Sequence, residues 1–165
     1  AAAGTLAAAA LAGVLLWQNA GSSELRGLGA VDVAPIYLGA PVRAYQTNEF
    51  AVFDSAMVHY AVGRYAEAGA LLERARTAGA QDAALDFFLG ASQLLAGSPE
   101  RAERAFTAVI DRGDNLYVAE AHFYRAKARL QRGDRNGALA DLRAAAAQDG
   151  ATRAGARALL QQLET

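Results

Sequence analysis

Residues Phe88 to Ile110 have the sequence FLGASQLLAGSPERAERAFTAVI, which is the clearest indication of the fold. Its first half is apolar and ends at Gly97, a residue type that commonly ends helices. Ser98 and Pro99 then supply an N-cap and a proline for the first turn of a second helix. The stretch therefore predicts a hairpin of two helices joined by a short turn.

The chain repeats this hairpin, because equivalent positions recur at spacings of 34 and then 36 residues. The glycines expected to end first helices follow these spacings at Gly63, Gly97 and Gly133. Sequence periods of this size mark proteins built from stacked repeats, in which small residues let neighbouring helices cross closely. We therefore expect an all-α solenoid of helical hairpins. Three further sets share both spacings, namely Ala56, Gly90 and Ala126; Ala68, Ala102 and Ala138; and Leu72, Phe106 and Leu142.

With this period the chain resembles the tetratricopeptide repeat (TPR) family over about residues 48–150. The characteristic tryptophan of the first helix is missing from every repeat, and Gly113 and Asp114 lengthen the turn before the third. An amphipathic helix over residues 151–165 should cap the last hairpin. The repeats implied by the resemblance span about 48–80, 81–113 and 114–150.

In this family the first helices of successive hairpins line a concave groove that binds partners. A row of aromatic side chains in such a groove would bury one side of a bound helix or extended peptide. Two alternatives stay open: the rings belong to the core, or the chain's own connector or terminal helix fills the groove. Family members that clamp a chaperone's C-terminal carboxylate use lysine, arginine and asparagine there, so we expect no such clamp here. The resemblance places in the groove Phe53, Met57, Tyr60, Phe87, Ala91, Leu94, Phe123, Lys127 and Leu130.

The N-terminal segment AAAGTLAAAALAGVLLW, residues 1–17, is uncharged, and the first charged residue is Glu24. A helix of this length reaches about 25 Å, slightly less than a bilayer core requires, so we expect an upstream continuation. The segment predicts a single-pass anchor in a bacterial inner membrane, with the repeats on the periplasmic side because few basic residues follow. A signal peptide and an alanine-rich helix in a globular core are the alternatives. Residues expected to pack or anchor this helix are Gly4, Ala8, Ala9, Ala12, Gly13 and Trp17.

Residues 18–47 are predicted to be a connector, because glycines and prolines interrupt any helical period. Its middle, VAPIYLGAPV, is too apolar for a freely solvated linker. We expect this part to dock either on the repeats or on a partner. The docking residues would be Ile36, Tyr37, Leu38 and Val42.

Composition narrows the classes of function. The net charge of −1 and the pI of about 6.2 provide no basic field for nucleic acid. Cysteine is absent, and His59 and His122 are isolated, so no metal site is expected. The sequence contains no phosphate-binding loop and no nucleophile motif. We therefore predict a protein that is not an enzyme and has no cofactor and no small-molecule substrate.

These features together predict a non-catalytic scaffold, tethered to a membrane, that binds or braces a partner protein. An accessory subunit of a large membrane complex of respiratory or photosynthetic type is the expected setting. The alternative is the extracytoplasmic sensor or regulator portion of a membrane-anchored TPR protein of anti-sigma-like type. A small enzyme is the competing class, and it lacks a nucleophile–base pair.

Overall fold

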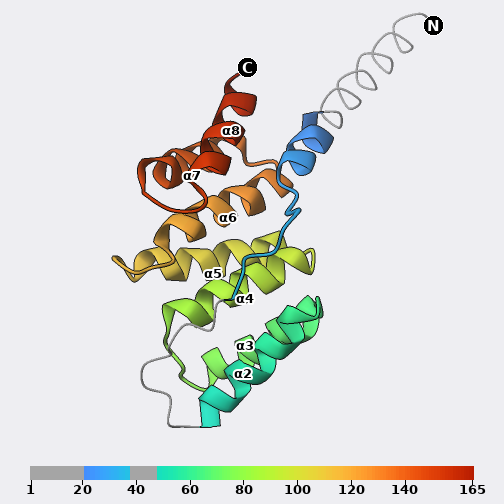
Figure 1. Cartoon of the computed structure of the whole chain (residues 1–165). Helices are drawn as coiled ribbons and strands as arrows, with labels where there is room; N and C mark the ends of the chain where they lie inside the picture. Colours follow the sequence, from blue (N-terminus) through green and yellow to red (C-terminus); the bar gives the residue numbers. More distant parts are fainter. Residues whose placement is uncertain (1–20, 38–47) are drawn as a thin grey trace, which may run out of the picture.

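A computed structural model describes residues 21–37 and 48–165, and helices are the only regular elements in these two ranges (Figure 1). A short helix covers residues 21–28. A segment without helix or strand then runs to residue 37, with a turn at Gly29 and a bend at residues 32–33. The remaining helices are α2 (Asn48–Ala61), α3 (Tyr65–Thr77), α4 (Ala83–Leu95), α5 (Pro99–Asp111), α6 (Val118–Gln131), α7 (Arg135–Ala147) and α8 (Arg153–Glu164).

Consecutive helices from α2 to α8 pack against each other, so the chain builds a stack of helical hairpins. The turns inside the hairpins contain Gly63, Gly97 and Gly133, whose φ angles are 76°, 76° and 81°. L-residues with a side chain rarely adopt this region, whereas glycine enters it at little cost. The repeated glycines of the sequence therefore mark a backbone requirement of each turn.

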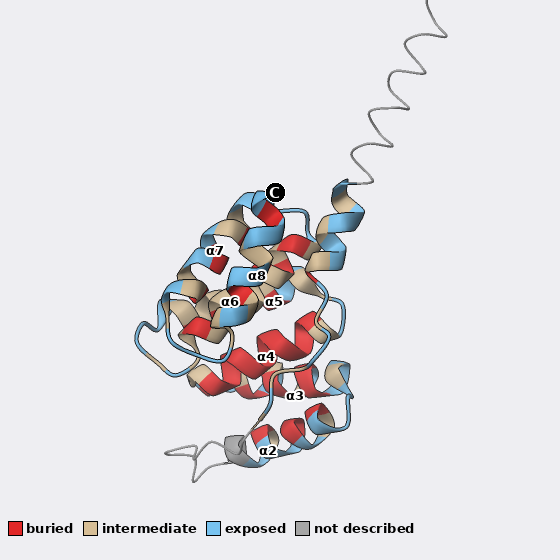
Figure 2. Ribbon diagram, turned by 45° about the horizontal axis from the view of Figure 1, so that its top comes forward, coloured by how far each residue is buried: buried red, intermediate tan, exposed pale blue. Residues whose placement is uncertain are grey.

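Helix α4 lies at the centre of the stack, and Figure 2 shows it as the most continuously buried helix. Every residue from Ala84 to Leu94 is buried. Gly90 is needed for this packing, because a β-carbon there would lie 2.8 Å from the ring of Phe106 on α5. The spacing of small and bulky residues in the sequence thus corresponds to close packing between successive helices.

The connector differs from its predicted irregular form, since residues 21–28 are helical despite Gly27. Leu25 and Leu28 pack against a buried cluster formed by α6, α7 and α8. This apolar contact explains why a short segment with weak helical propensity forms a helix here, because tertiary packing supplies most helix stability in proteins.

The prediction of an all-helical, TPR-like fold is confirmed for the described residues. The expected single-pass location in a bacterial inner membrane, with a periplasmic repeat domain, is corrected. Across residues 21–37 and 48–165, no helix combines the length and the apolarity that crossing a bilayer requires. The segment 1–17 lies outside the described residues, as do its expected packing positions Gly4, Ala8, Ala9, Ala12, Gly13 and Trp17.

Candidate functional site

The connector lies on the repeats. Residues 29–37, called the strap from here on, cross one side of α2, α4 and α6 (Figure 1). This side is called the first-helix face. The strap contains no helix or strand, and side chains of the body bind the carbonyls of Gly29, Ala30 and Pro35.

The strap begins in close contact with α6. Gly29 is buried, and a β-carbon on it would lie 2.7 Å from the carbonyl oxygen of Lys127 and 2.9 Å from the amide nitrogen of Gln131. The Gln131 side chain donates a hydrogen bond of 2.9 Å to the Gly29 carbonyl. Lys127 donates through Nζ to the carbonyl of Ala30. Glycine is therefore required where the strap meets the backbone of α6.

The strap ends against α2 and α4. The hydroxyl of Tyr60 donates a hydrogen bond of 3.0 Å to the carbonyl of Pro35. Two residues later, the ring of Tyr37 makes edge contacts with Phe53 of α2 and Phe88 of α4, at centroid distances of 5.9 and 5.3 Å. Such arrangements are favoured by the charge distribution of aromatic rings. The Tyr37 ring and the Pro35 carbonyl therefore hold this end together.

Side chains of the strap divide into two sets. Every third residue packs against the core of the repeats, at Val31, Ala34 and Tyr37. Val33 and Ile36 point away, with exposures of 73% and 74%. The strap thus lies on the body with one side and presents apolar side chains to solvent with the other.

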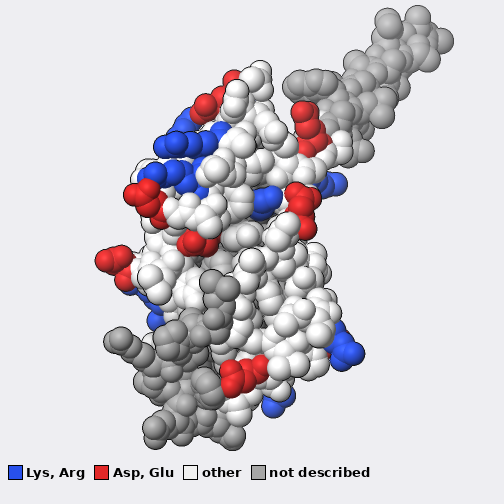
Figure 3. All heavy atoms as spheres, in the orientation of Figure 1, with Lys and Arg blue, Asp and Glu red and all other residues white. Residues whose placement is uncertain are grey.

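A pocket of about 580 Å³ lies beside the strap. This volume falls in the range of small-ligand and side-chain pockets. Leu116, which is 89% exposed, stands at its wall. In Figure 3, white atoms cover most of the side that the strap crosses, with few charged side chains among them. The lining outside the strap consists of Phe87, Leu116, Tyr117, Glu120, Phe123, Tyr124, Lys127, Ala151, Thr152 and Gly155.

Two titratable groups of this pocket, Lys127 and Tyr124, are partly buried, and burial disfavours their charged forms. Burial lowers the pKa of Lys127, and the charge of Asp32 partly opposes this effect. The Lys127 ammonium also lies 5.5 Å from the centroid of the Phe123 ring. Burial, with a smaller contribution from Glu120, raises the pKa of Tyr124 to about 12, so its hydroxyl stays protonated near neutral pH. The pocket therefore suits the apolar side chains and main-chain carbonyls of a ligand better than an anionic ligand.

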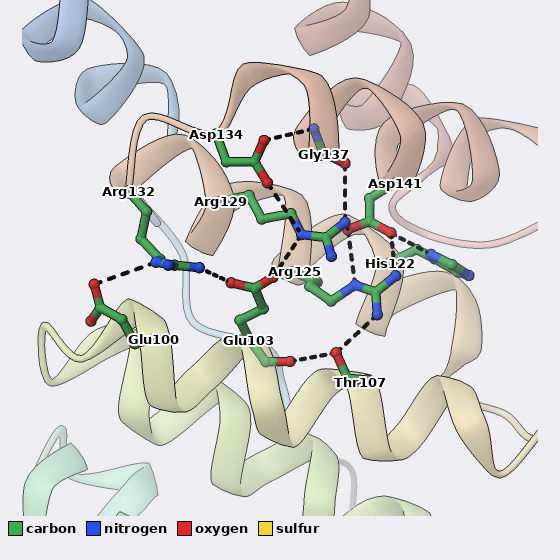
Figure 4. A network of polar contacts seen from close by, with 10 residues as sticks. All are labelled: Glu100, Glu103, Thr107, His122, Arg125, Arg129, Arg132, Asp134, Gly137 and Asp141. Carbon is green, nitrogen blue, oxygen red and sulfur yellow. Dashed lines mark hydrogen bonds and ion pairs between the residues drawn. The ribbon is translucent and has the colours of Figure 1, made fainter.

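Helix α6 carries much of the site, and a network of charged side chains holds it between α5 and α7 (Figure 4). Asp141 of α7 is buried and accepts hydrogen bonds from Arg125 at 2.7 and 2.9 Å and from Arg129 at 2.8 Å. Nδ1 of His122 lies 2.8 Å from the same carboxylate. Arg129 reaches Glu103 of α5 at 2.9 Å. The network therefore positions α6 between α5 and α7.

Burial alone would raise the pKa of Asp141. The hydrogen bonds from His122 and Arg125 and the charges of Arg125 and Arg129 outweigh burial and hold this pKa below its usual value. Asp141 is therefore a carboxylate in the folded protein, and its role is structural.

The nine residues expected in the groove occupy two environments. Phe123 and Lys127 are partly exposed and line the pocket beside the strap. Phe87 also lines it, although its ring is almost fully buried and stacks on Tyr117 at 4.9 Å. The other six are buried in or beside the core, namely Phe53, Met57, Tyr60, Ala91, Leu94 and Leu130. Tyr60 and Phe53 nevertheless touch the strap.

Two of the four expected docking residues of the connector lie in the described part of the chain, and their environments differ. Tyr37 packs on the body, whereas Ile36 points to solvent. Leu38 and Val42 lie outside the described residues. Of the residues that hold the strap backbone, Tyr60 and Lys127 were among those expected in the groove. Gly29 and Gln131 were not expected from sequence, because they give no periodic signal.

Comparisons with known proteins identify the fold. No protein-family model and no curated protein matches the sequence. Among solved structures, PcrH from Pseudomonas aeruginosa matches with a TM-score of 0.63 and 23% identity, over 76% of this chain and 99% of PcrH. SycD from Yersinia enterocolitica, in complex with a peptide of the translocator YopD, matches with a TM-score of 0.62 and 17% identity, over 70% and 91%.

A third structure, PcrH in complex with the chaperone binding region of PopD, matches with a TM-score of 0.62 and 23% identity, over 70% of this chain and 90% of PcrH. The class defined by this likeness is that of TPR-like helical repeat proteins, to which the type III secretion chaperones SycD and PcrH belong. At these identities the likeness establishes the shared fold.

Proposed function

We propose that this chain is a non-catalytic binding module whose first-helix face holds an extended segment of a partner protein. The observation that carries the proposal is the strap itself. The face already holds nine residues of chain without helix or strand, through hydrogen bonds to main-chain carbonyls and an aromatic contact. Many peptide-binding domains hold the main chain of a peptide by hydrogen bonds and take up its side chains in pockets.

The similar structures support the same kind of ligand. Those of SycD and PcrH include complexes with a peptide of YopD and with the chaperone binding regions of PopD and PopB. A short segment of a partner is thus a known ligand for this fold. The apolar pocket beside the strap, bordered by the exposed Leu116, offers this chain a place for side chains of such a segment.

Membrane tethering and a place in a respiratory or photosynthetic complex are not part of the proposal, because neither the described residues nor the comparisons support them. An anti-sigma-like sensor is likewise without support. His122 contacts the buried carboxylate of Asp141 within the arginine network, where the pair links α6 to α7. Peptide binding is the function that the contacts favour.

The proposal is tested by selecting peptides of about 12 residues from a random library on the immobilised protein and measuring their affinity by calorimetry. We expect extended apolar peptides to bind the native chain. Phe123→Ala should weaken them at least about tenfold, because burying one aromatic ring contributes a few kcal/mol. Val58→Ala, on the exposed side of α2, is the control and should bind like the native chain. Failure to select any peptide, or equal binding to Phe123→Ala, would contradict the proposal.

A further inference from the structure

The strap makes contacts that a separate peptide could make equally well. Gln131, Lys127 and Tyr60 bind main-chain carbonyls, which every peptide offers. The strap's most specific contact is the ring of Tyr37 between Phe53 and Phe88. The strap therefore occupies the face as a ligand would.

We propose that the strap is an intramolecular ligand of the first-helix face and that a partner segment of the same chemistry displaces it. This inference rests on the proposed function. The segment is apolar and begins with a glycine that can approach α6 as Gly29 does. It also carries an aromatic residue two positions after a proline, as Pro35 and Tyr37 do in the strap. Its carbonyls take the hydrogen bonds of Tyr60, Lys127 and Gln131.

Two features make the strap suited to exchange. It contacts the body on one side only, and Asp32, Val33 and Ile36 remain exposed. It is also joined to the repeats by its own chain. An attached ligand has an effective concentration on the order of millimolar, so it excludes weak ligands and yields to strong ones. The strap thus sets an affinity threshold for partners.

Gly29 provides a way to open the strap without altering the face. A β-carbon there would lie 2.7 Å from the Lys127 carbonyl oxygen and 2.9 Å from the Gln131 amide nitrogen, both in the backbone of α6. Gly29→Val therefore pushes the start of the strap away. Gly27→Val is the matched control, because a β-carbon at Gly27 meets no atom within 4 Å.

The probe is a fluorescein-labelled synthetic peptide with the strap's own sequence, GAVDVAPIY, residues 29–37. Its binding to the full chain is followed by anisotropy up to millimolar protein. If the strap is closed more than about nine-tenths of the time, opening it strengthens the apparent affinity at least about tenfold. We expect this gain for Gly29→Val and no gain for Gly27→Val. A probe with serine in place of the final tyrosine should bind Gly29→Val at least about tenfold more weakly.

Tyr37→Ser is the second strap-opening variant, for use if Gly29→Val does not fold, and Ile36→Ser is its exposed control. Equal affinity of the probe for the native chain and a folded opened variant, or no binding to that variant, would overturn the inference. Library peptides that bind native and opened chains equally would also overturn it while leaving the proposed function intact. If the probe binds the opened variants and no library peptide binds any form, the intramolecular ligand stands and the proposed function fails.

Discussion

The hydroxyl of Tyr60 and the carbonyl oxygen of Pro35 lie 3.0 Å apart and form a hydrogen bond between residues separated by 25 positions. This bond ties the strap to α2, while Gln131 and Lys127 tie the other end to α6. The strap therefore connects the first hairpin to the third across the face. Its occupancy of that face is the basis of both proposals.

Tyr60→Phe removes this bond and keeps the ring. A typical hydrogen bond contributes about 1 kcal/mol net, so the free energy of unfolding should fall by about that amount in urea titrations. Amide exchange in the strap should accelerate. Tyr65→Phe is the control, because the Tyr65 hydroxyl has no hydrogen-bond partner in the described part of the chain. Unchanged strap exchange in Tyr60→Phe would show that the bond does not hold the strap.

Gly90→Ala should destabilise the centre of the stack by about 1–3 kcal/mol, because its β-carbon would meet the Phe106 ring at 2.8 Å. Gly69→Ala in α3 is the matched change. Its β-carbon would lie 3.5 Å from that of Ser92, an ordinary contact, so the gain in helix propensity should stabilise by about 0.5–1 kcal/mol. Thermal melts of both variants measure the difference. Similar effects of the two substitutions would contradict the close contact of α4 with Phe106.

Phe87→Glu should unfold the repeats and not merely block binding. The ring is buried and stacks on Tyr117 at 4.9 Å, so the change removes an aromatic side chain and buries a carboxylate. We expect a loss of about 3 kcal/mol or more, seen as a loss of helical circular dichroism. Leu116→Glu, at an 89% exposed position, is the control and should keep native stability. Native helicity in Phe87→Glu would mean that the ring faces solvent.

Asp141→Asn should cost about 3 kcal/mol at neutral pH, because it removes the charge that faces Arg125 and Arg129 in a buried site. The network also predicts a pH dependence. The folded-state pKa of Asp141 lies below the unfolded value of about 3.9, so its stabilisation is present above about pH 4 and is lost as pH falls through the folded pKa.

The stability difference between the native chain and Asp141→Asn should therefore shrink on acidification below about pH 4. Urea unfolding at several pH values measures it. A difference that grows on acidification would contradict the lowered pKa.

The sequence predicts the repeat because its cause is local. Glycines at Gly63, Gly97 and Gly133 recur where the turns need positive φ. A small residue likewise recurs at the position of Gly90, where α5 comes close. The backbone conformation of each turn and the narrow space between helices therefore restrict the residue type at regular intervals. This period is visible in the sequence alone.

The site is harder to predict from the sequence than the repeat is. A buried ring such as Phe53 and a pocket-lining ring such as Phe123 have the same residue type and follow the same repeat spacing, so periodicity does not separate them. Contacts of the strap involve main-chain carbonyls, which carry no sequence signal. The pairing of Asp141 with Arg125 and Arg129 depends on three-dimensional proximity between two helices.

Nuclear Overhauser contacts between aromatic rings, recorded for the full chain before and after saturation with a library-selected peptide, show whether a peptide displaces the strap. In the free chain we predict contacts of Tyr37 with both Phe53 and Phe88. On saturation these should vanish, while the contact between Tyr60 and Phe88 inside the body should persist. Contacts of Tyr37 that survive in the saturated complex, or are absent from the free chain, would contradict the account.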